Sequence, residues 1–269
     1  METCYRHDDR ETGRHCTRCG KAACSDCLRS ASVGSHCLDC VKSATPPVAE
    51  RVRIQVATAG PILTYVFLAA NLAAFVVVPG SGSRLAEYSL WAPAIDINGE
   101  WWRIITSGFL HGSVMHIAFN MFALYRIGPV VEQTLGWLRF LGVYVIGLLG
   151  GSFLAMALEP ESPAVGASGA LFGLFGALWV LYQRRGINPW STGIGGLIVI
   201  NLLITFAVPI ISVGGHVGGL LAGGVAAFVL SPERTGWRSS TPIAILIIAV
   251  GVAAMFVAAL VAANAATPF

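Results

Sequence analysis

The stretch from Pro163 to Gly176, PAVGASGALFGLFG, decides how the rest of the chain is organised. A proline and small residues make its first half a poor helix interior. The sequence from Ala170 to about Tyr182 is continuously apolar and predicts a helix. Ser168 lies in the first turn of this helix, where backbone N–H groups lack intrahelical partners and the helix dipole is positive. The serine is therefore either a nucleophile beside an anion site or the N-cap of a glycine-packed membrane helix.

The composition places this helix in a membrane protein. Of 269 residues, 55% are hydrophobic and only 12% are charged, whereas soluble domains are about a quarter charged. The net charge of +3 is small and says little about partners; the expected environment is the bilayer, and no nucleic acid is expected to bind. Several apolar runs reach the length of about 20 residues that crosses a bilayer. We expect an all-α polytopic protein with spans at about 60–79, 112–130, 138–158, 168–183, 193–210, 215–231 and 241–263.

The first 45 residues, called the head below, differ from the rest because they hold all seven cysteines. Two-residue spacing lets both members of a pair bind one metal ion, and eight ligands make two tetrahedral zinc sites. His15 and His36 are alternatives to His7 as a ligand. A disulfide scaffold is the competing interpretation, but seven is odd and the head has no export signal. The four expected pairs are Cys4 and His7, Cys16 and Cys19, Cys24 and Cys27, and Cys37 and Cys40.

The distribution of basic residues predicts the orientation. Nine of the 17 Lys and Arg residues lie before residue 54, and the expected outer loops hold only Arg84 and Arg103. The positive-inside rule therefore places the head in the cytoplasm and the C-terminus outside. The head would fold around its metals and serve in binding or regulation, with a cytoplasmic protein as its candidate partner. The expected domains are a zinc-binding head at 1–45, a linker at 46–58, a six-span core at 59–231, and a loop with the seventh span at 232–269.

The first outer loop, at about 80–111, is long and rich in large apolar side chains. Aromatic side chains of this kind rest at the membrane interface, so we expect this loop to lie partly in the outer leaflet. The residues in question are Trp91, Ile95, Trp101, Trp102, Ile104 and Phe109.

Polar side chains occur inside three of the expected spans. His116 and Asn120 are four residues apart and share one face of the second span. Ser168 and His216 lie near the outer ends of the fourth and sixth spans. A lone histidine could serve only as a structural hydrogen-bonding group, but four polar residues on three spans favour a functional site. Spans four and six should touch, because small residues at helical spacing permit close approach; these are Gly169, Gly173 and Gly176, and Gly219 and Gly223.

Five motifs follow one another along the chain: Trp102-Arg103, His116-x3-Asn120, Gly128-x3-Glu132-x3-Gly136, Gly166-x-Ser168-Gly169 and His216-x2-Gly219-x3-Gly223. Together they resemble the motifs of rhomboid intramembrane serine proteases, over about residues 60–231. The resemblance implies a six-helix core to which the seventh span is added. The head resembles treble-clef and B-box-like fingers, in which the first and third pairs bind one ion and the second and fourth bind the other.

The rhomboid resemblance implies roles for individual residues. Ser168 would be the nucleophile, His216 its general base, and His116 and Asn120 would form the oxyanion hole with the Ser168 N–H. Glu132 and Arg103 would be structural. Phe172 stands where many bacterial members have a tyrosine stacked on the catalytic histidine; its phenyl ring can still pack on an imidazole. No aspartate in the spans is placed to orient His216, so we expect a Ser–His dyad.

The implied function is that of a serine endopeptidase that cleaves single-span membrane proteins near the outer membrane face. One alternative is a proteolytically inactive rhomboid-like protein that binds membrane clients, and the presence of both Ser168 and His216 disfavours it. Another is a transporter with a zinc-binding regulatory head, which the clustering of polar residues in the outer half of the spans disfavours. The excess of Arg over Lys, 15 to 2, points to a GC-rich bacterial source and hence to the plasma membrane.

Overall fold

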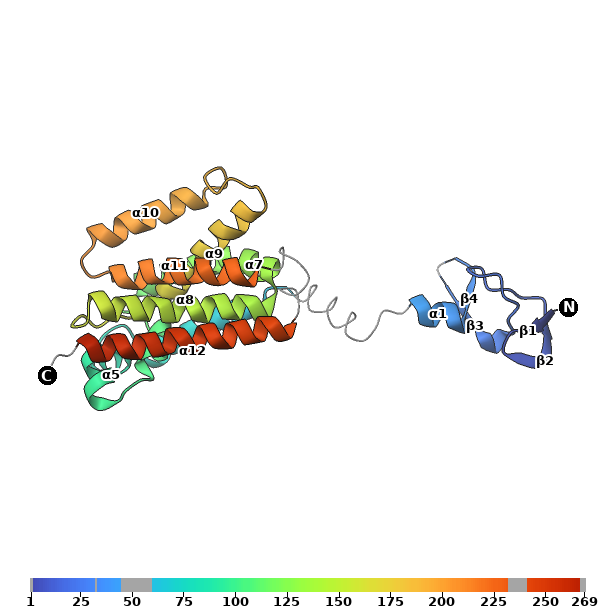
Figure 1. The fold of residues 1–269 in the computed structure, drawn as a ribbon, viewed down its shortest axis with the longest axis horizontal. Coiled ribbons are helices and arrows are strands. Elements are labelled where there is room, and N and C mark those ends of the chain that lie inside the picture. Colours follow the sequence, from blue (N-terminus) through green and yellow to red (C-terminus); the bar gives the residue numbers. More distant parts are fainter. Residues whose placement is uncertain (1, 32, 45–59, 232–240, 267–269) are drawn as a thin grey trace. The chain divides into compact units, whose positions relative to one another are not determined.

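The computed structural model describes residues 2–31, 33–44, 60–231 and 241–266. They fall into two units, one within Met1–Ala59 and the other within Gly60–Phe269. Figure 1 labels the elements of both, and each unit is described by itself. The linker expected at 46–58 lies outside the described residues.

The head consists of two short hairpins and one helix. Strand β1 (Glu2–Cys4) pairs antiparallel with β2 (His7–Thr12), and β3 (Leu28–Ser30) pairs antiparallel with β4 (Ser35–Cys37). The turn η1 (Ser25–Cys27) precedes β3, and helix α1 (Leu38–Ala44) follows β4. The buried cluster consists of five cysteines and Ala23, and the partly buried side chains of Tyr5, Leu28 and Leu38 pack against it. A core of this size does not hold a fold by apolar burial alone.

In the membrane unit, each of the seven expected spans contains one long helix among the described residues. Four of these helices are long and apolar enough to cross a membrane: α7 (Val114–Leu135), α8 (Trp137–Leu158), α11 (Val213–Leu230) and α12 (Thr241–Ala266). The others are α3 (Ile62–Val77), α9 (Ser168–Arg184) and α10 (Ile194–Ala207). The described part of the chain is therefore mostly helical, as expected for a polytopic membrane protein.

Helices α3 and α10 are shorter than the spans predicted for them. They have 16 and 14 residues, which rise about 24 and 21 Å, less than the roughly 30 Å of a bilayer core. Prolines bound both helices. Pro61 precedes α3 as its N-cap residue, and Pro209 follows the C-cap of α10. The predicted limits of about 60–79 and 193–210 agree with these helices to within three residues, and the remaining apolar residues lie beyond the last helical turn.

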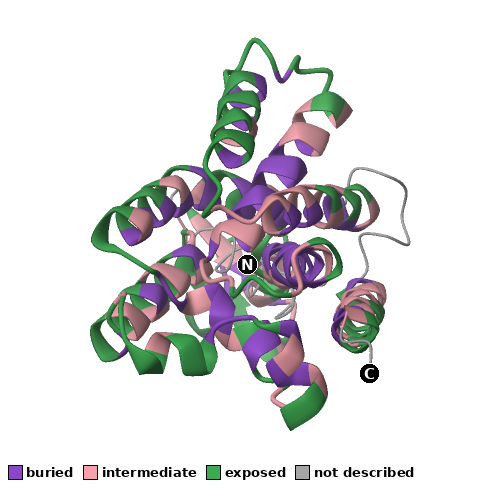
Figure 2. Cartoon of the chain, turned by 90° about the vertical axis from the view of Figure 1, so that its left-hand side faces the viewer, coloured by how far each residue is buried: buried purple, intermediate pink, exposed green. Residues whose placement is uncertain are grey.

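Helix α8 lies in the middle of the unit and packs against α9, α11 and α12. The contact with α9 and α11 is made through glycines. A Cβ on Gly151 would lie 2.7 Å from the backbone oxygen of Gly215, and one on Gly147 would lie 3.0 Å from the Cα of Gly173. Figure 2 shows buried residues gathered toward the centre of the helix bundle and exposed residues around its outside.

Helices α9 and α11 also touch directly, as predicted. A Cβ on Gly219 would overlap the backbone oxygen of Gly169, and a Cβ on Gly223 would overlap Gly173. The glycine contact predicted between the fourth and sixth spans is thus confirmed.

The segment between α3 and α7 folds into α4 (Ser83–Tyr88), α5 (Ala92–Asn98), α6 (Arg103–Thr106) and the turn η2 (Ser107–Phe109). Trp101 and Trp102 are exposed, as expected for an interfacial segment, but Ile95 and Ile104 are buried in the main core. These two isoleucines therefore belong to the core of the unit and not to its exposed surface. Helix α5 packs against α12 and the α6 region packs against α8, which covers both side chains.

Candidate active site and metal clusters

Ser168 is the first residue of α9, and Ala167 occupies the N-cap position. The N-cap interpretation of Ser168 is therefore wrong. Ala167 has no side-chain acceptor, so the first N–H groups of α9 remain available beside the serine hydroxyl. The positive end of the helix dipole adds to the attraction for an anion at this point. The start of α9 therefore places the Ser168 hydroxyl beside backbone N–H groups that can donate hydrogen bonds.

The His116 ring and the Ser168 hydroxyl border the same small space beside Gly166. A Cβ added to Gly166 would lie 2.8 Å from His116 Nε2 and 3.5 Å from Ser168 Oγ. Gly166 has a φ of +134°, and its N–H donates to the backbone oxygen of Ser107 at 2.9 Å. The absence of a side chain at this position, together with a backbone conformation that suits glycine, keeps the space open.

His216 lies on α11 and stacks on Phe172 of α9, with ring centroids 4.1 Å apart and planes inclined by 18°. Phe172 is one turn beyond Ser168, so the stack brings the imidazole to the side of α9 that carries the serine. The phenyl ring thus packs on the imidazole as expected. Among the described residues no hydrogen bond joins Ser168 to His216; such bonds are often long until substrate is bound.

Glu159, at the end of α8, holds the beginning of α11. Its carboxylate accepts hydrogen bonds from the N–H groups of Val213 at 2.9 Å and Gly214 at 3.3 Å, and from the Ser212 hydroxyl at 2.6 Å. These bonds satisfy donors that a helix N-terminus leaves free. They anchor the first turn of α11, in which His216 is the fourth residue. From the sequence, Glu159 was assigned no role.

A hydroxyl from α10 contacts the far side of the His216 ring. Thr205 Oγ1 lies 2.6 Å from His216 Nδ1 and 2.7 Å from the backbone oxygen of Asn201. Sequence reasoning missed this residue. A threonine in an apolar helix ordinarily bonds its own backbone, so nothing in the local sequence marks it.

Asn120 is buried on α7, and its Nδ2 has no hydrogen-bond partner in the described structure. Leaving a buried donor unpaired costs about 1–3 kcal/mol, so such a group calls for an explanation. A donor kept for a ligand is one explanation that suits this position, because His116 lies one turn earlier on the same helix.

Glu132 and Arg103 have the structural roles expected of them. The Glu132 carboxylate accepts hydrogen bonds from the Leu63 N–H at 2.9 Å, and from the N–H and hydroxyl of Thr64 at 2.8 and 2.7 Å. It therefore satisfies the start of α3. Arg103 forms an ion pair with Glu100 and donates to backbone oxygens of the preceding segment. These contacts engage both side chains, so neither is available for a catalytic role.

The head brings its eight ligand-type residues together in two clusters, Cys4, His7, Cys24 and Cys27, and Cys16, Cys19, Cys37 and Cys40. This is the grouping of first with third and second with fourth pairs. In each cluster the ligand atoms all lie within 4.8 Å of one another. His7 belongs to the first cluster, whereas the alternative His15 bonds Glu2 at 3.0 Å. All seven cysteines are described and none forms a disulfide.

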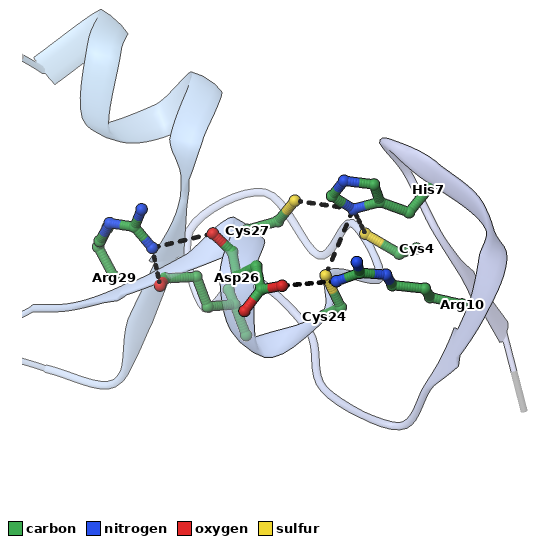
Figure 3. Close-up of polar contacts among 8 residues, drawn as sticks. Cys4, His7, Arg10, Cys24, Asp26, Cys27 and Arg29 are labelled. Atoms are coloured by element: carbon green, nitrogen blue, oxygen red, sulfur yellow. Dashed lines mark hydrogen bonds and ion pairs between the residues drawn. The ribbon is translucent and has the colours of Figure 1, made fainter.

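The spacing of the ligand atoms fits a tetrahedral zinc ion. Figure 3 shows three sulfur atoms converging on His7 Nδ1, at 3.4 Å from Cys27, 3.5 Å from Cys24 and 3.7 Å from Cys4. Zn–S bonds of about 2.3 Å and Zn–N bonds of about 2.0–2.1 Å would set S···N near 3.6 Å and S···S near 3.8 Å. In the second cluster two sulfurs, those of Cys19 and Cys37, are 3.7 Å apart.

The thiols of the first cluster differ in how readily they ionise. Burial opposes ionisation of Cys4, but hydrogen bonds from the backbone of Cys24 and Arg6 and from the His7 ring lower its pKa to about 6. Burial and hydrogen bonds with Cys24 and Cys4 raise the pKa of the Cys27 thiol to about 11. Packed thiols resist ionising together, and a divalent cation among them would remove that resistance.

Comparison with known proteins finds relatives for the membrane unit. A model of the Rhomboid domain matches residues 98–233, which include Ser168, His216, His116 and Asn120. Rhomboid protease GluP of Bacillus subtilis is 35% identical over 205 residues, which are 73% of this chain and 40% of GluP. RHOMBOID-like protein 5 of Arabidopsis thaliana is 39% identical over 141 residues, 49% of this chain and 45% of that protein.

This chain matches a third relative over nearly the whole length of that relative. The putative rhomboid protease YdcA of Bacillus subtilis is 33% identical over 180 residues, which are 65% of this chain and 90% of YdcA. The chain therefore spans less than half the length of GluP and of RHOMBOID-like protein 5, but nearly all of YdcA.

Proposed function

The chain belongs to the rhomboid family, and from that premise we propose that it is an intramembrane serine endopeptidase. Its substrates would be single-span membrane proteins, cut near the outer face of the membrane. The observation that carries the proposal is the placement of Ser168 at the uncapped start of α9, with His216 stacked on Phe172 one turn further along. Two relatives, GluP and YdcA, carry the name of rhomboid protease, which supports it.

The proposed reaction divides the work between two side chains. Ser168 Oγ attacks the carbonyl carbon of the scissile peptide bond while His216 Nε2 takes the hydroxyl proton. The same nitrogen then delivers that proton to the leaving amine. Water then attacks the acyl carbon while His216 takes one of its protons, and His216 returns this proton to Ser168 Oγ as the bond between Oγ and the acyl group breaks. His216 lies at the side of the serine helix that this exchange requires.

The negative charge that develops on the carbonyl oxygen needs fixed donors. We assign this role to Asn120 Nδ2, to His116 and to the Ser168 N–H. The unpaired state of Asn120 Nδ2 and the opening beside Gly166, which His116 Nε2 and Ser168 Oγ share, support the assignment. A regular helix hides its peptide bonds, so a substrate must unwind locally, and small or helix-breaking residues near the cut would help it do so.

For the head we propose two structural zinc ions, one in each cluster, held by Cys4, His7, Cys24 and Cys27 and by Cys16, Cys19, Cys37 and Cys40. Zinc would supply folding free energy there and take no part in peptide hydrolysis. The basic residues before the first span support a cytoplasmic head and an outer C-terminus. The proposed domains remain the head at 1–45, the linker at 46–58, the core at 59–231 and the seventh span with its loop at 232–269.

A serine-reactive fluorophosphonate probe and a model single-span substrate test the proposal on the full chain in detergent. Ser168→Ala and His216→Ala should each abolish cleavage, and the double variant should be no worse than either. Asn120→Ala removes one of three donors, so its rate should fall about 10–1000-fold. The matched control is Ser152→Ala, because the Ser152 hydroxyl is buried on α8 and bonds only the backbone oxygen of Ile104.

The outcomes separate the alternatives. The proposal expects labelling of the wild type and of Ser152→Ala, and no labelling of Ser168→Ala. Continued labelling or cleavage by Ser168→Ala would refute the role of that serine. A folded wild type that binds the substrate without cutting it would favour the inactive, client-binding alternative.

A further inference from the structure

Two hydrogen-bond contacts in a row connect α10 to the His216 ring on α11. The Asn201 backbone oxygen lies 2.7 Å from Thr205 Oγ1, and Thr205 Oγ1 lies 2.6 Å from His216 Nδ1. Both distances are those of well-formed hydrogen bonds. Thr205 is 1% exposed, so water does not compete for its hydroxyl.

The number of protons in these two contacts decides which way each bond runs. A threonine hydroxyl has one proton to donate and lone pairs to accept with, and a backbone carbonyl can only accept. Thr205 must therefore donate to Asn201, since two oxygens 2.7 Å apart repel without a proton between them. The hydroxyl then has only lone pairs to offer His216, so Nδ1 of the imidazole carries a proton.

A proton on Nδ1 has a consequence for the other ring nitrogen. A neutral imidazole carries one proton, so Nε2 is left with its lone pair free. This is the state that a general base for Ser168 needs. The reverse tautomer would point an N–H at the serine and could not accept its proton.

We propose that Thr205 is a positioning residue that holds His216 in the Nδ1–H tautomer and fixes the direction of its ring. The role rests on the proposed function of His216 as the base. It adds a positioning group to the expected Ser–His dyad: the place that an aspartate takes in a Ser–His–Asp triad is here taken by a neutral hydroxyl, itself oriented by the Asn201 carbonyl. The hydroxyl also remains a hydrogen-bond acceptor when His216 becomes doubly protonated during the reaction.

The test compares Thr205→Val, which keeps the shape and removes the hydroxyl, with Thr205→Ser, which keeps the hydroxyl. Thr205→Val should lower kcat about 10–100-fold with KM nearly unchanged, since a lost hydrogen bond to a charged group accounts for that factor. Thr205→Ser should recover most of the rate. The matched control is Thr192→Val, because among the residues that the structure describes the Thr192 hydroxyl bonds only the backbone oxygen of Pro189. That variant should cleave like wild type.

A second readout does not depend on cleavage. Nitrogen-15 spectra of histidine-labelled protein in the Ser168→Ala background distinguish the two tautomers, and His216→Ala identifies the signal. We expect Nδ1–H for His216 in the Thr205 protein and a mixture of tautomers in Thr205→Val. An Nε2–H tautomer with Thr205 in place would overturn the proposal, as would a Thr205→Val protein with unchanged kcat. Absence of cleavage in the wild type together with an Nδ1–H signal would instead count against the proposed protease function alone.

Discussion

The buried core of the head consists mainly of cysteine side chains, whereas in the core of the membrane unit the backbones of neighbouring helices are in close contact. In the head the buried cluster is five cysteines around Ala23, with little apolar surface to add. In the membrane unit, glycines such as Gly147, Gly173 and Gly219 bring three helices into backbone contact, and large apolar side chains fill the space around them. The difference lies in what completes each core. On the proposal of two zinc ions, the first would be completed by ligands from outside the chain, whereas the second would need only the fit of its own helices.

The largest effect that this comparison predicts is the unfolding of the head on removal of metal. The purified full chain should contain about two zinc ions. A strong chelator should expose residues of the head to protease while the thermal unfolding of the membrane unit stays unchanged. The reason is that structural zinc sites contribute about 10–16 kcal/mol to the folding of small domains.

Two histidines of the head allow a matched control for this prediction. His7→Ala should release one zinc ion, because His7 lies in the first cluster. His15→Ala should release none, because the His15 ring bonds Glu2 at 3.0 Å and belongs to neither cluster. A head that resists protease after complete metal removal would show that its core is sufficient without metal.

A smaller effect is expected when one methyl group enters the glycine contacts. In Gly219→Ala the new Cβ would overlap the Gly169 backbone oxygen, and backbone cannot move aside as a flexible side chain can. We expect a loss of about 1–3 kcal/mol or more in the stability of the membrane unit, with the zinc content of the head unchanged. Thermal unfolding in detergent measures the first and metal analysis the second.

Gly196→Ala is the control for this change. It is the same substitution within a helix, on α10, and a Cβ there would meet nothing within 4 Å. Alanine is also the better helix former, so this variant should be as stable as wild type or slightly more so. Equal stability of the two variants would mean that the helices of this unit are not held by close glycine contact.

The smallest expected effect is that of deleting residues 1–45 on cleavage. All four residues proposed for catalysis lie between 116 and 216, and the match to the Rhomboid domain begins only at residue 98. Sites without shared partners act almost independently, so the rate on a model substrate in detergent should stay within about twofold of the full chain. Complete loss of cleavage in a truncated protein that is still folded would show instead that the head controls the active site.

Features that depend on local sequence were the ones that could be predicted. Two-residue spacing of ligands, apolar runs and the G-x-S-G motif are each contained in a few consecutive residues, and they identified the clusters, the helices and Ser168. The stack of Phe172 on His216 was also predictable, because the rhomboid resemblance places Phe172 where many bacterial members have a tyrosine stacked on the catalytic histidine.

Features that depend on contacts between distant segments were missed. Glu159 caps a helix that begins more than fifty residues later, and Thr205 meets His216 across two helices. Neither has a neighbour in the sequence that signals its role. The burial of Ile95 and Ile104 was not foreseen for the same reason, because only the packing of α5 and α6 shows that they are covered.

The imidazole of His216 is held by three other helices. Phe172 of α9 supports its face, Thr205 of α10 bonds Nδ1, and Glu159 at the end of α8 anchors the turn from which it projects. During biogenesis these helices enter the bilayer one after another and associate afterwards. We expect a partly assembled molecule to hold the serine and the histidine without the arrangement that makes them reactive. Because the last steps of assembly place His216 as the proposed base, a partly assembled molecule would not cleave other proteins of the same membrane indiscriminately.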